Sequence, residues 1–447
     1  MSLRRPAGRA AKRNPNVLAW EGGIDDKGAH MAWNTNVLVG QSGGPTAAIN
    51  ASLAGVFDTA RDLGAHVLGM RYGIEGYLAG RVLHLDRTLG DPMDVELLRR
   101  TPASFLGSCR FKLPQPDEDP AFYEDAFAKF EASRVGAVLY IGGNDSMDTI
   151  DRLSRWGDEH NSPIRFIGIP KTIDNDLVGT DHTPGYGSAA KYIATSMREI
   201  ERDGSVYDLK SVTFVEIMGR DAGWLTGAAC LAGEQGNPCP DLVLLPEVTL
   251  NQEALLQRLS LLLERKNTVV VAVSEGVRHR DGTLLCEAAA EAADGTRLDA
   301  FGHVASLSGT GRYLASVTRA ALGCKTRAIE LSTLQRCASH VASATDLAEA
   351  YALGGAGVLA AHDGKTAMMS AITRIFDKPY LYDTTLTPIS EVANKARMVP
   401  REFISYDGMN VTAAFERYAR PLIEGEVSST YQGGVPHHIT PLDGNRA

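Results

Sequence analysis

The sequence is dominated by short apolar runs that end in glycine or polar clusters and are each followed by a longer stretch of helical character. β-Branched residues are common in these runs. Strands of this kind, buried on both faces and separated by helices, indicate a parallel α/β architecture. The candidate strands are NVLVGQ (36–41), GAVLYIGG (136–143), RFIGIP (165–170), SVTFVEIMG (211–219), DLVLLPE (241–247) and TVVVAVSEG (268–276).

The chain is long enough for more than one core. Its 447 residues exceed the usual size of a single domain, and 44% of them are hydrophobic, so we expect two lobes. The formal net charge of −9 gives no overall attraction for nucleic acid. An anionic small-molecule substrate therefore needs a local basic pocket.

Cysteine usage and hydropathy favour a cytoplasmic protein without a membrane anchor. The six cysteines form no CxxC pair and no zinc-type cluster, which is typical of a reduced compartment. No apolar run approaches the roughly 20 residues of a membrane helix. Residues 1–34 lack apolar periodicity and are interpreted as a flexible tail, with an organelle transit peptide as the alternative.

Two glycine-rich segments follow the first two candidate strands. In SGGPTAAIN (42–50), Gly43 and Gly44 let the backbone approach a phosphate at the start of a helix, although a tight turn without ligand fits equally well. In IGGNDS (141–146), Gly143 has the same property, and Asn144 and Asp145 offer oxygen ligands for a hard cation such as magnesium. A helix cap is the structural alternative for this second segment.

The segment PKTIDNDL (170–177) closes the third candidate strand. Asp174 and Asp176 raise each other's pKa if they face one pocket, which suits a base that accepts a hydroxyl proton. Lys171 beside them can offset phosphate charge. An Asx turn is the alternative, whereas an EF-hand is excluded because Gly185 stands where its glutamate is required.

Further polar residues follow the later candidate strands. Arginine offers a bidentate fork for phosphate, and a glutamate is a good acceptor for sugar hydroxyls. Each of these residues alone is more often a solvated surface charge. Their repeated occurrence after strands favours a site, formed by Met218, Gly219, Arg220, Glu275, Arg327 and Arg336.

Taken together and in this order, the motifs resemble the 6-phosphofructokinase family. The resemblance runs from about Asn36 to Ala360 and rests on SGGPTAAIN, FLGSCRF, IGGNDS, PKTIDND, GTDHTPGYGSA, VEIMGRDAGWLT, SEG and TLQR. It implies two three-layer α/β lobes with mainly parallel sheets and an active site in the cleft between them. It further implies a donor lobe of residues 35–187, completed by 337–390, and a sugar-phosphate lobe of 188–336, completed by 391–447.

The resemblance also implies roles for individual residues. Gly43, Gly44, Arg110 and Gly143 match donor-phosphate positions, and Asn144 matches the position that holds Mg²⁺. Asp174 matches the general base for the 1-hydroxyl of fructose 6-phosphate. The positions that match the sugar-phosphate site are Thr172, Ile173, Asp174, Asp176, Met218, Gly219, Arg220, Glu275, Arg327, Thr333 and Arg336.

Two positions indicate the phosphoryl donor. ATP-using relatives have glycine where this chain has Asp145 and Lys171. A carboxylate at 145 repels the α-phosphate of a nucleotide, and a lysine at 171 can stabilise transfer from pyrophosphate. The chain therefore resembles the pyrophosphate-dependent branch, which implies a reversible reaction in which Arg220 and Lys171 stabilise charge on the phosphates. An ATP-dependent enzyme is the alternative.

Some positions depart from the family pattern. Asn144 replaces an aspartate, Ser211 replaces an arginine that a neighbouring subunit commonly donates, and Thr333 replaces histidine or tyrosine. These changes leave sedoheptulose 7-phosphate open as a main acceptor. A non-catalytic regulatory subunit is disfavoured because both aspartates of the base motif are present. Arg327 matches a residue shared between subunits, which implies a homodimer or homotetramer.

Overall fold

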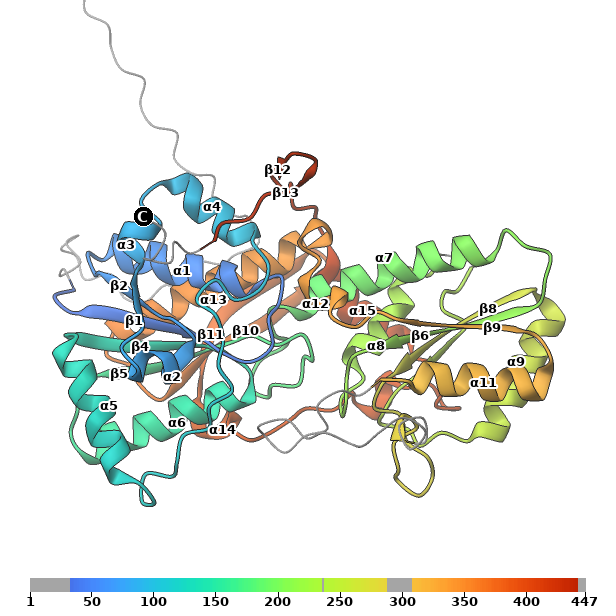
Figure 1. Cartoon of the computed structure of the whole chain (residues 1–447), viewed down its shortest axis with the longest axis horizontal. Helices are drawn as coiled ribbons and strands as arrows, with labels where there is room; N and C mark the ends of the chain where they lie inside the picture. The colour runs from blue at the N-terminus through green and yellow to red at the C-terminus, as the bar shows by residue number, and fades with distance from the viewer. Residues whose placement is uncertain (1–32, 235–236, 288–307, 441–447) are drawn as a thin grey trace, which may run out of the picture.

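The computed structural model describes residues 33–234, 237–287 and 308–440. These residues form two α/β lobes lying side by side, as expected from the sequence, with helix α7 extending from one lobe along the other (Figure 1). The predicted tail falls outside the described residues up to residue 32. Trp33 packs edge-on against His362, with ring centroids 5.6 Å apart.

The larger lobe is built on a seven-stranded sheet with the order β11-β10-β5-β4-β1-β2-β3. The central strands pair in parallel, and only the edge strands β3 and β11 run antiparallel to their neighbours. Its strands are β1 (Asn36–Gln41), β2 (Val67–Met70), β3 (Val82–His84), β4 (Val135–Gly142), β5 (Arg165–Pro170), β10 (Met368–Asp377) and β11 (Tyr380–Pro388).

Helices cover both faces of this sheet. Val37 and Val39 of β1 face one hydrophobic cluster, and Leu38 between them faces the other, as the two-residue period of a strand requires. The first cluster includes α1 (Ile49–Asp62), α4 (Pro92–Arg100) and α13 (Ala344–His362). The second includes α2 (Gly73–Leu78), α5 (Pro120–Ala132), α6 (Asn144–Glu159) and α14 (Ile389–Val392), and the short helix α3 (Leu85–Thr88) follows β3.

The smaller lobe contains a four-stranded, wholly parallel sheet with the order β7-β8-β6-β9. Val215 and Ile217 of β6 face one cluster, and Val212 and Phe214 face the other. Its strands are β6 (Ser211–Ile217), β7 (Leu242–Leu244), β8 (Thr268–Ser274) and β9 (Lys325–Glu330). Its helices are α7 (Tyr186–Gly204), α8 (Trp224–Ala228), α9 (Gln252–Arg265), α11 (Thr310–Leu322), α12 (Leu334–Cys337) and α15 (Ala413–Ala419).

All six strands predicted from the sequence are present, each within a few residues of the predicted range. The remaining short elements are the 3₁₀ helices η1 (Ala229–Ala232), η2 (Ser339–Val341), η3 (Arg401–Phe403) and η4 (Arg420–Ile423), with the hairpin β12 (Tyr431–Gln432) and β13 (Val435–Pro436). The residue boundaries of the two lobes stay a prediction. In the described part of the chain, no helix combines the length and the apolarity needed to cross a bilayer.

Candidate active site

A cleft of about 320 Å³ lies between residues of the two lobes. The larger lobe contributes the segments that follow β1, β4 and β5, and the smaller lobe contributes those that follow β6, β8 and β9. This is the carboxyl-end location expected for a ligand site in parallel sheets. The cleft is lined by Ser42, Gly43, Gly44, Cys109, Arg110, Phe111, Asp145, Thr149, Asp174, Met218, Arg220, Glu275 and Arg336.

The loop after β1 is fixed from three directions. The Ser42 hydroxyl lies 2.6 Å from that of Ser146, and Ser108 donates a 2.7 Å hydrogen bond to the Gly43 carbonyl. The Lys171 ammonium donates to the Gly44 carbonyl over 2.6 Å. Gly43 has φ +76°, a left-handed conformation that glycine adopts without strain. The loop therefore presents a well-anchored backbone to the cleft.

The loop after β4 leads directly into α6, whose first residue is Asn144. A β-carbon at Gly142 would clash with the Ser146 side chain and would lie 3.2 Å from the Ser42 carbonyl of the loop after β1, so only glycine fits here. The Asn144 amide nitrogen donates to an Asp176 carboxylate oxygen over 3.4 Å. Its Oδ1 atom is buried and has no hydrogen-bond partner among the described residues. Asp145 is exposed and lines the cleft.

Lys171 is the buried cation of the site, with only 2% of its surface exposed. Burial lowers the pKa of its amine to about 8, while the nearby Asp174 carboxylate opposes this decrease. At pH 7, about one unit below that pKa, the Lys171 amine is protonated in most molecules. A cation with little water around it interacts strongly with an anion in the cleft.

Asp174 lies on the cleft wall close to Thr172, whose hydroxyl is 3.3 Å from the carboxylate and accepts from the Asp174 backbone over 3.1 Å. Burial raises the pKa of Asp174, opposed by the Thr172 hydrogen bond and by the charges of Lys171 and Arg336. Burial and the Asp174 charge likewise raise the pKa of Asp176. Both carboxyls are therefore better proton acceptors than ordinary aspartates.

The smaller lobe supplies a second wall around Gly219, whose backbone conformation favours glycine over any other residue. Gly219 has φ +137°, and a β-carbon there would lie 2.7 Å from the Ala222 carbonyl. Its backbone nitrogen donates to Glu275 over 3.2 Å, and its carbonyl accepts from Ser274 over 2.5 Å. Burial raises the pKa of Glu275 to about 7. This arrangement brings Met218 and Glu275 to the same wall.

Arg336 connects the two walls. It lies on α12 of the smaller lobe, and one of its Nη atoms is 3.5 Å from where a β-carbon of Gly44 would be. Arg220 also lines the cleft from the smaller lobe. The cations Lys171, Arg110, Arg220 and Arg336 thus come together, from distant parts of the sequence, in a protein with a net charge of −9.

Comparison with known proteins agrees with this geometry. A family model described as phosphofructokinase matches residues 36–361. The chain belongs to the phosphofructokinase family. The resemblance noted from the motifs is thereby confirmed over almost the same residues.

The relatives of this phosphofructokinase-family chain include proteins named pyrophosphate–fructose 6-phosphate 1-phosphotransferase. The one from Methylococcus capsulatus is 40% identical over 410 residues, which cover 91% of this chain and 95% of that protein. The one from Xanthomonas campestris is also 40% identical over 410 residues, covering 91% and 96%. The crystal structure of the pyrophosphate-dependent phosphofructokinase from Nitrosospira multiformis matches with a TM-score of 0.81 at 34% identity, covering 91% and 96%.

Several residues predicted for the site do not line the cleft. The Ile173 side chain is buried in a hydrophobic cluster, so only its backbone can face a ligand. Thr333 is exposed at the start of α12, and Asp176 points to Asn144 instead of into the cleft. Thr172, Gly143 and Gly219 do not line the cleft either, but each is a chain neighbour or contact of a residue close to it. Fewer residues therefore line the cleft than the sequence motifs predicted.

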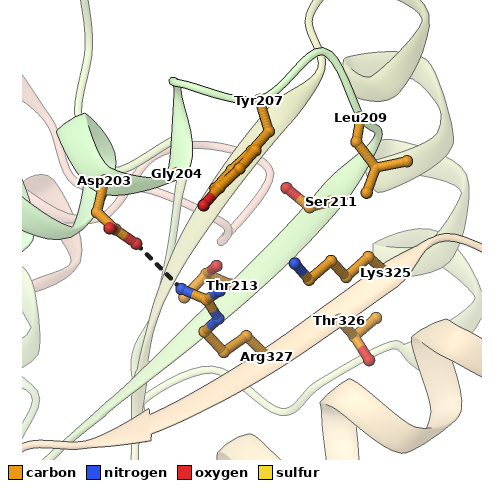
Figure 2. A pocket seen from close by; sticks show the side chains of 9 residues that line it. All are labelled: Asp203, Gly204, Tyr207, Leu209, Ser211, Thr213, Lys325, Thr326 and Arg327. Carbon is orange, nitrogen blue, oxygen red and sulfur yellow. Dashed lines mark hydrogen bonds and ion pairs between the residues drawn. The ribbon is translucent and has the colours of Figure 1, made fainter.

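Arg327 lies elsewhere, in a second hollow at the amino ends of β6 and β9 (Figure 2). It forms an exposed ion pair with Asp203 over 3.1 Å. Lys325 and Ser211 line the same hollow, as does Tyr207, whose ring is 5.6 Å from the Lys325 ammonium. Within one chain, Arg327 therefore cannot belong to the interlobe cleft.

The sequence interpretation missed some residues of the cleft wall, namely Ser42, Cys109, Phe111 and Thr149. The first three lie next to predicted positions within the motifs SGGP and GSCRF. Thr149 lies four residues after Asp145 on α6, so helical spacing places both on one face. That four-residue spacing could have identified Thr149 from the sequence.

The donor set of the cleft fits magnesium better than a metal bound entirely by the protein. Among the described residues, there is no group of three or more histidine, cysteine, aspartate or glutamate side chains that could hold a metal ion. The buried Oδ1 of Asn144 has no hydrogen-bond partner among the described residues, and the neighbouring Asp145 side chain lines the cleft. Magnesium commonly takes one or two protein oxygens and completes its shell with phosphates and water.

Proposed function

We propose that the chain transfers a phosphoryl group from pyrophosphate to the 1-hydroxyl of fructose 6-phosphate, giving fructose 1,6-bisphosphate and phosphate. The observation that carries the proposal is the position of Lys171. Its buried ammonium is bonded to the donor-side loop at Gly44 and is close to Asp174 on the cleft wall. A cation held there can stabilise charge on the transferring group.

The donor side of the cleft matches a small polyphosphate. Gly43, Gly44 and Arg110 line the part of the cleft where we propose that the two phosphate groups lie. Arginine and peptide N–H groups both bind phosphate oxygens well. The exposed Asp145 carboxylate disfavours a nucleotide through repulsion of its additional phosphate and through lost space.

The acceptor side provides a base and a cationic wall. In the proposed step, the 1-hydroxyl oxygen of the sugar forms a bond to phosphorus while the bridging P–O bond of pyrophosphate breaks. Asp174 takes the hydroxyl proton, and phosphate leaves. Arg220 and Arg336 bind the 6-phosphate or the charge of the transferring group, and Glu275 accepts hydrogen bonds from sugar hydroxyls.

Magnesium at Asn144 and Asp145 would neutralise negative charge on the phosphates when it is bound. The protein's own contribution is to orient these two side chains. Asn144 is oriented by its hydrogen bond to Asp176, and Asp145 by its place in the first turn of α6. Thr172 and Asp176 keep the base loop in position next to them.

We further propose that the enzyme works as a homodimer or homotetramer in which Arg327 of one subunit reaches the sugar phosphate of its neighbour. The hollow around Arg327 and Lys325 is cationic, and it borders the exposed side chains of Tyr207 and Leu209, of which 60% and 53% of the surface is accessible. Arg327 and Lys325 do not line the interlobe cleft of their own chain. Their position beside exposed apolar side chains supports a contact with another subunit.

One assay tests the function. Purified protein with magnesium and fructose 6-phosphate is offered pyrophosphate or ATP in separate reactions, and phosphorus NMR follows the products. We expect fructose 1,6-bisphosphate and phosphate from pyrophosphate, and pyrophosphate again when the products are supplied. Formation of the bisphosphate from ATP alone would contradict the proposal.

A further inference from the structure

The loop that carries Asp174 is held from behind by the C-terminal part of the chain, beyond residue 361 where the family match ends. The Arg397 backbone nitrogen donates to the Asp176 carbonyl over 2.7 Å. Its guanidinium donates to the Asn175 carbonyl over 3.1 Å and to the Asp181 carbonyl over 2.8 Å. One arginine therefore binds the backbone of two residues that directly follow Asp174.

Tyr418 of α15 completes this support. Its hydroxyl accepts a 2.8 Å hydrogen bond from the Asn175 side chain and donates a 3.0 Å bond to the Asp181 carbonyl. Asn175 has φ +55°, which is an uncommon conformation for a residue with a β-carbon. The Asn175 Oδ1 also accepts from the Thr183 backbone over 3.0 Å. Asparagine adopts this left-handed conformation more readily than most residues with a β-carbon, and these bonds hold it there.

Arg397 also bonds to the smaller lobe. Its guanidinium lies 4.6 Å from the ring centroid of Trp224, and the Trp224 indole donates to the Arg397 carbonyl over 3.0 Å. Two residues later, the Val399 nitrogen donates to Glu247 over 2.9 Å. The same segment thus contacts the base loop of the larger lobe and the first helix after β6 in the smaller lobe.

Asp174 itself has few restraints. Among the described residues, the one hydrogen bond of its side chain is that from the Thr172 hydroxyl over 3.3 Å, and the charges of Lys171 and Arg336 act on it without a hydrogen bond. Its position therefore depends on the backbone of the residues that follow it. In a transfer that needs the base, the hydroxyl and the phosphorus in line, a displacement of about 1 Å can lower the rate about 100-fold.

We infer that Arg397 and Tyr418 are positioning residues that hold Asp174 in line for proton transfer, an inference that rests on the proposed function. Neither lines the cleft, and both contact the base loop through its backbone or through Asn175. The fold does not depend on them alone, because Arg374 binds the Asp181 carboxylate over 2.9 and 3.1 Å. His182 binds the same carboxylate over 2.7 Å. The loop can therefore relax without the lobe unfolding.

The test compares two substitutions with two matched controls in the full-length protein. Tyr418→Phe removes only the hydroxyl, and Arg397→Lys keeps the charge but loses the fork that reaches several carbonyls. The control for the first is Tyr382→Phe, whose buried hydroxyl has no partner among the described residues. The control for the second is Arg401→Lys, whose guanidinium, within the described ranges, binds only carbonyls of its own segment, at 404, 405 and 406.

We expect kcat with pyrophosphate to fall about 10-fold in Tyr418→Phe and about 10- to 100-fold in Arg397→Lys. The KM for each substrate should stay within about threefold of the parent, and fructose 6-phosphate should raise the Tm of each variant as it does for the parent, because the binding groups are untouched. Both controls should keep the parental kcat.

Parental kcat in folded Tyr418→Phe and Arg397→Lys would overturn the inference while leaving the proposed function intact. So would a loss of kcat that is matched by loss of the sugar-induced Tm shift, because that result indicates a role in folding or binding. If Arg397→Lys does not fold, Tyr418→Phe decides the question. An unmodified protein that is inactive with pyrophosphate would instead overturn the proposed function, and the inference with it.

Discussion

The two ends of the smaller sheet differ in the burial and the chemistry of the side chains found there. At the carboxyl ends of β6 and β8, Arg220 and Glu275 line the interlobe cleft opposite Asp174, a carboxyl of raised pKa. The buried Lys171 is hydrogen-bonded to the cleft loop at Gly44. At the amino ends of β6 and β9, Arg327 and Asp203 form an exposed pair in an open hollow. Both ends are cationic, but only the first combines buried titratable groups whose pKa values are shifted by burial. We therefore propose that the first end serves the reaction and the second serves recognition.

The largest effect should come from removing the base. We expect Asp174→Ala to lower kcat with pyrophosphate about 10²- to 10⁴-fold, as is usual for loss of a general base. Steady-state kinetics check this, with Asp203→Ala in the hollow as the matched control that keeps kcat within about twofold. Near-parental turnover of folded Asp174→Ala would assign the base to another group.

The next effect concerns the buried cation. We expect Lys171→Met to lower kcat with pyrophosphate by about 100- to 1,000-fold, because one preorganised contact to the reacting group is worth about 2.7–4 kcal/mol. Lys325→Met, in the hollow, should leave kcat unchanged. Equal effects of the two substitutions would remove the distinction between the two ends of the sheet.

A smaller effect is expected from a substitution in the hollow, and it should fall on the binding of fructose 6-phosphate. Arg327→Ala should raise the KM for fructose 6-phosphate about 10- to 100-fold with little change in kcat, since charge-assisted bonds to a phosphate contribute about 1.5–3 kcal/mol. Mixing Arg327→Ala with Asp174→Ala chains should restore part of the activity. Mixed oligomers without any rescue would count against a site shared between subunits.

The smallest effect is a change in pH dependence. The proposed mechanism requires a deprotonated Asp174, so activity should be lost as the pH falls through the raised pKa of that carboxyl. It also requires a protonated Lys171, so kcat/KM should fall as the pH rises through the pKa of about 8. The profile is therefore a bell, and the alkaline limb should be absent in Lys171→Met. An unchanged alkaline limb in that variant would assign it to another group.

The sequence predicted the parts of the fold and the site that depend on local pattern. The six buried strands are recognisable from their apolar runs, and the residues after them reach the cleft because parallel strands bring their carboxyl ends together. Gly43, Asp145 and Asp174 were found in this way. The family resemblance added Arg110, which follows no predicted strand.

Contacts between distant segments could not be predicted from the pattern. Strand β10 adds to the larger sheet by pairing Met368 with Ile167, two hundred residues earlier, and no local signal specifies that pairing. The left-handed conformation of Asn175 directs Asp176 to Asn144, which the spacing of the two aspartates does not show. The contact of Arg397 with the base loop is of the same kind.

We propose that the cleft uses pyrophosphate because Asp145 excludes a nucleotide and Lys171 stabilises transfer from the smaller donor. The most direct measurement is the ratio of kcat/KM for pyrophosphate to that for ATP, determined for the unmodified chain and for Asp145→Gly with fructose 6-phosphate and magnesium. We predict a strong preference for pyrophosphate in the unmodified chain, and measurable or increased use of ATP in Asp145→Gly. A preference for ATP in the unmodified chain, or a ratio unaltered in a folded Asp145→Gly variant, would contradict the account.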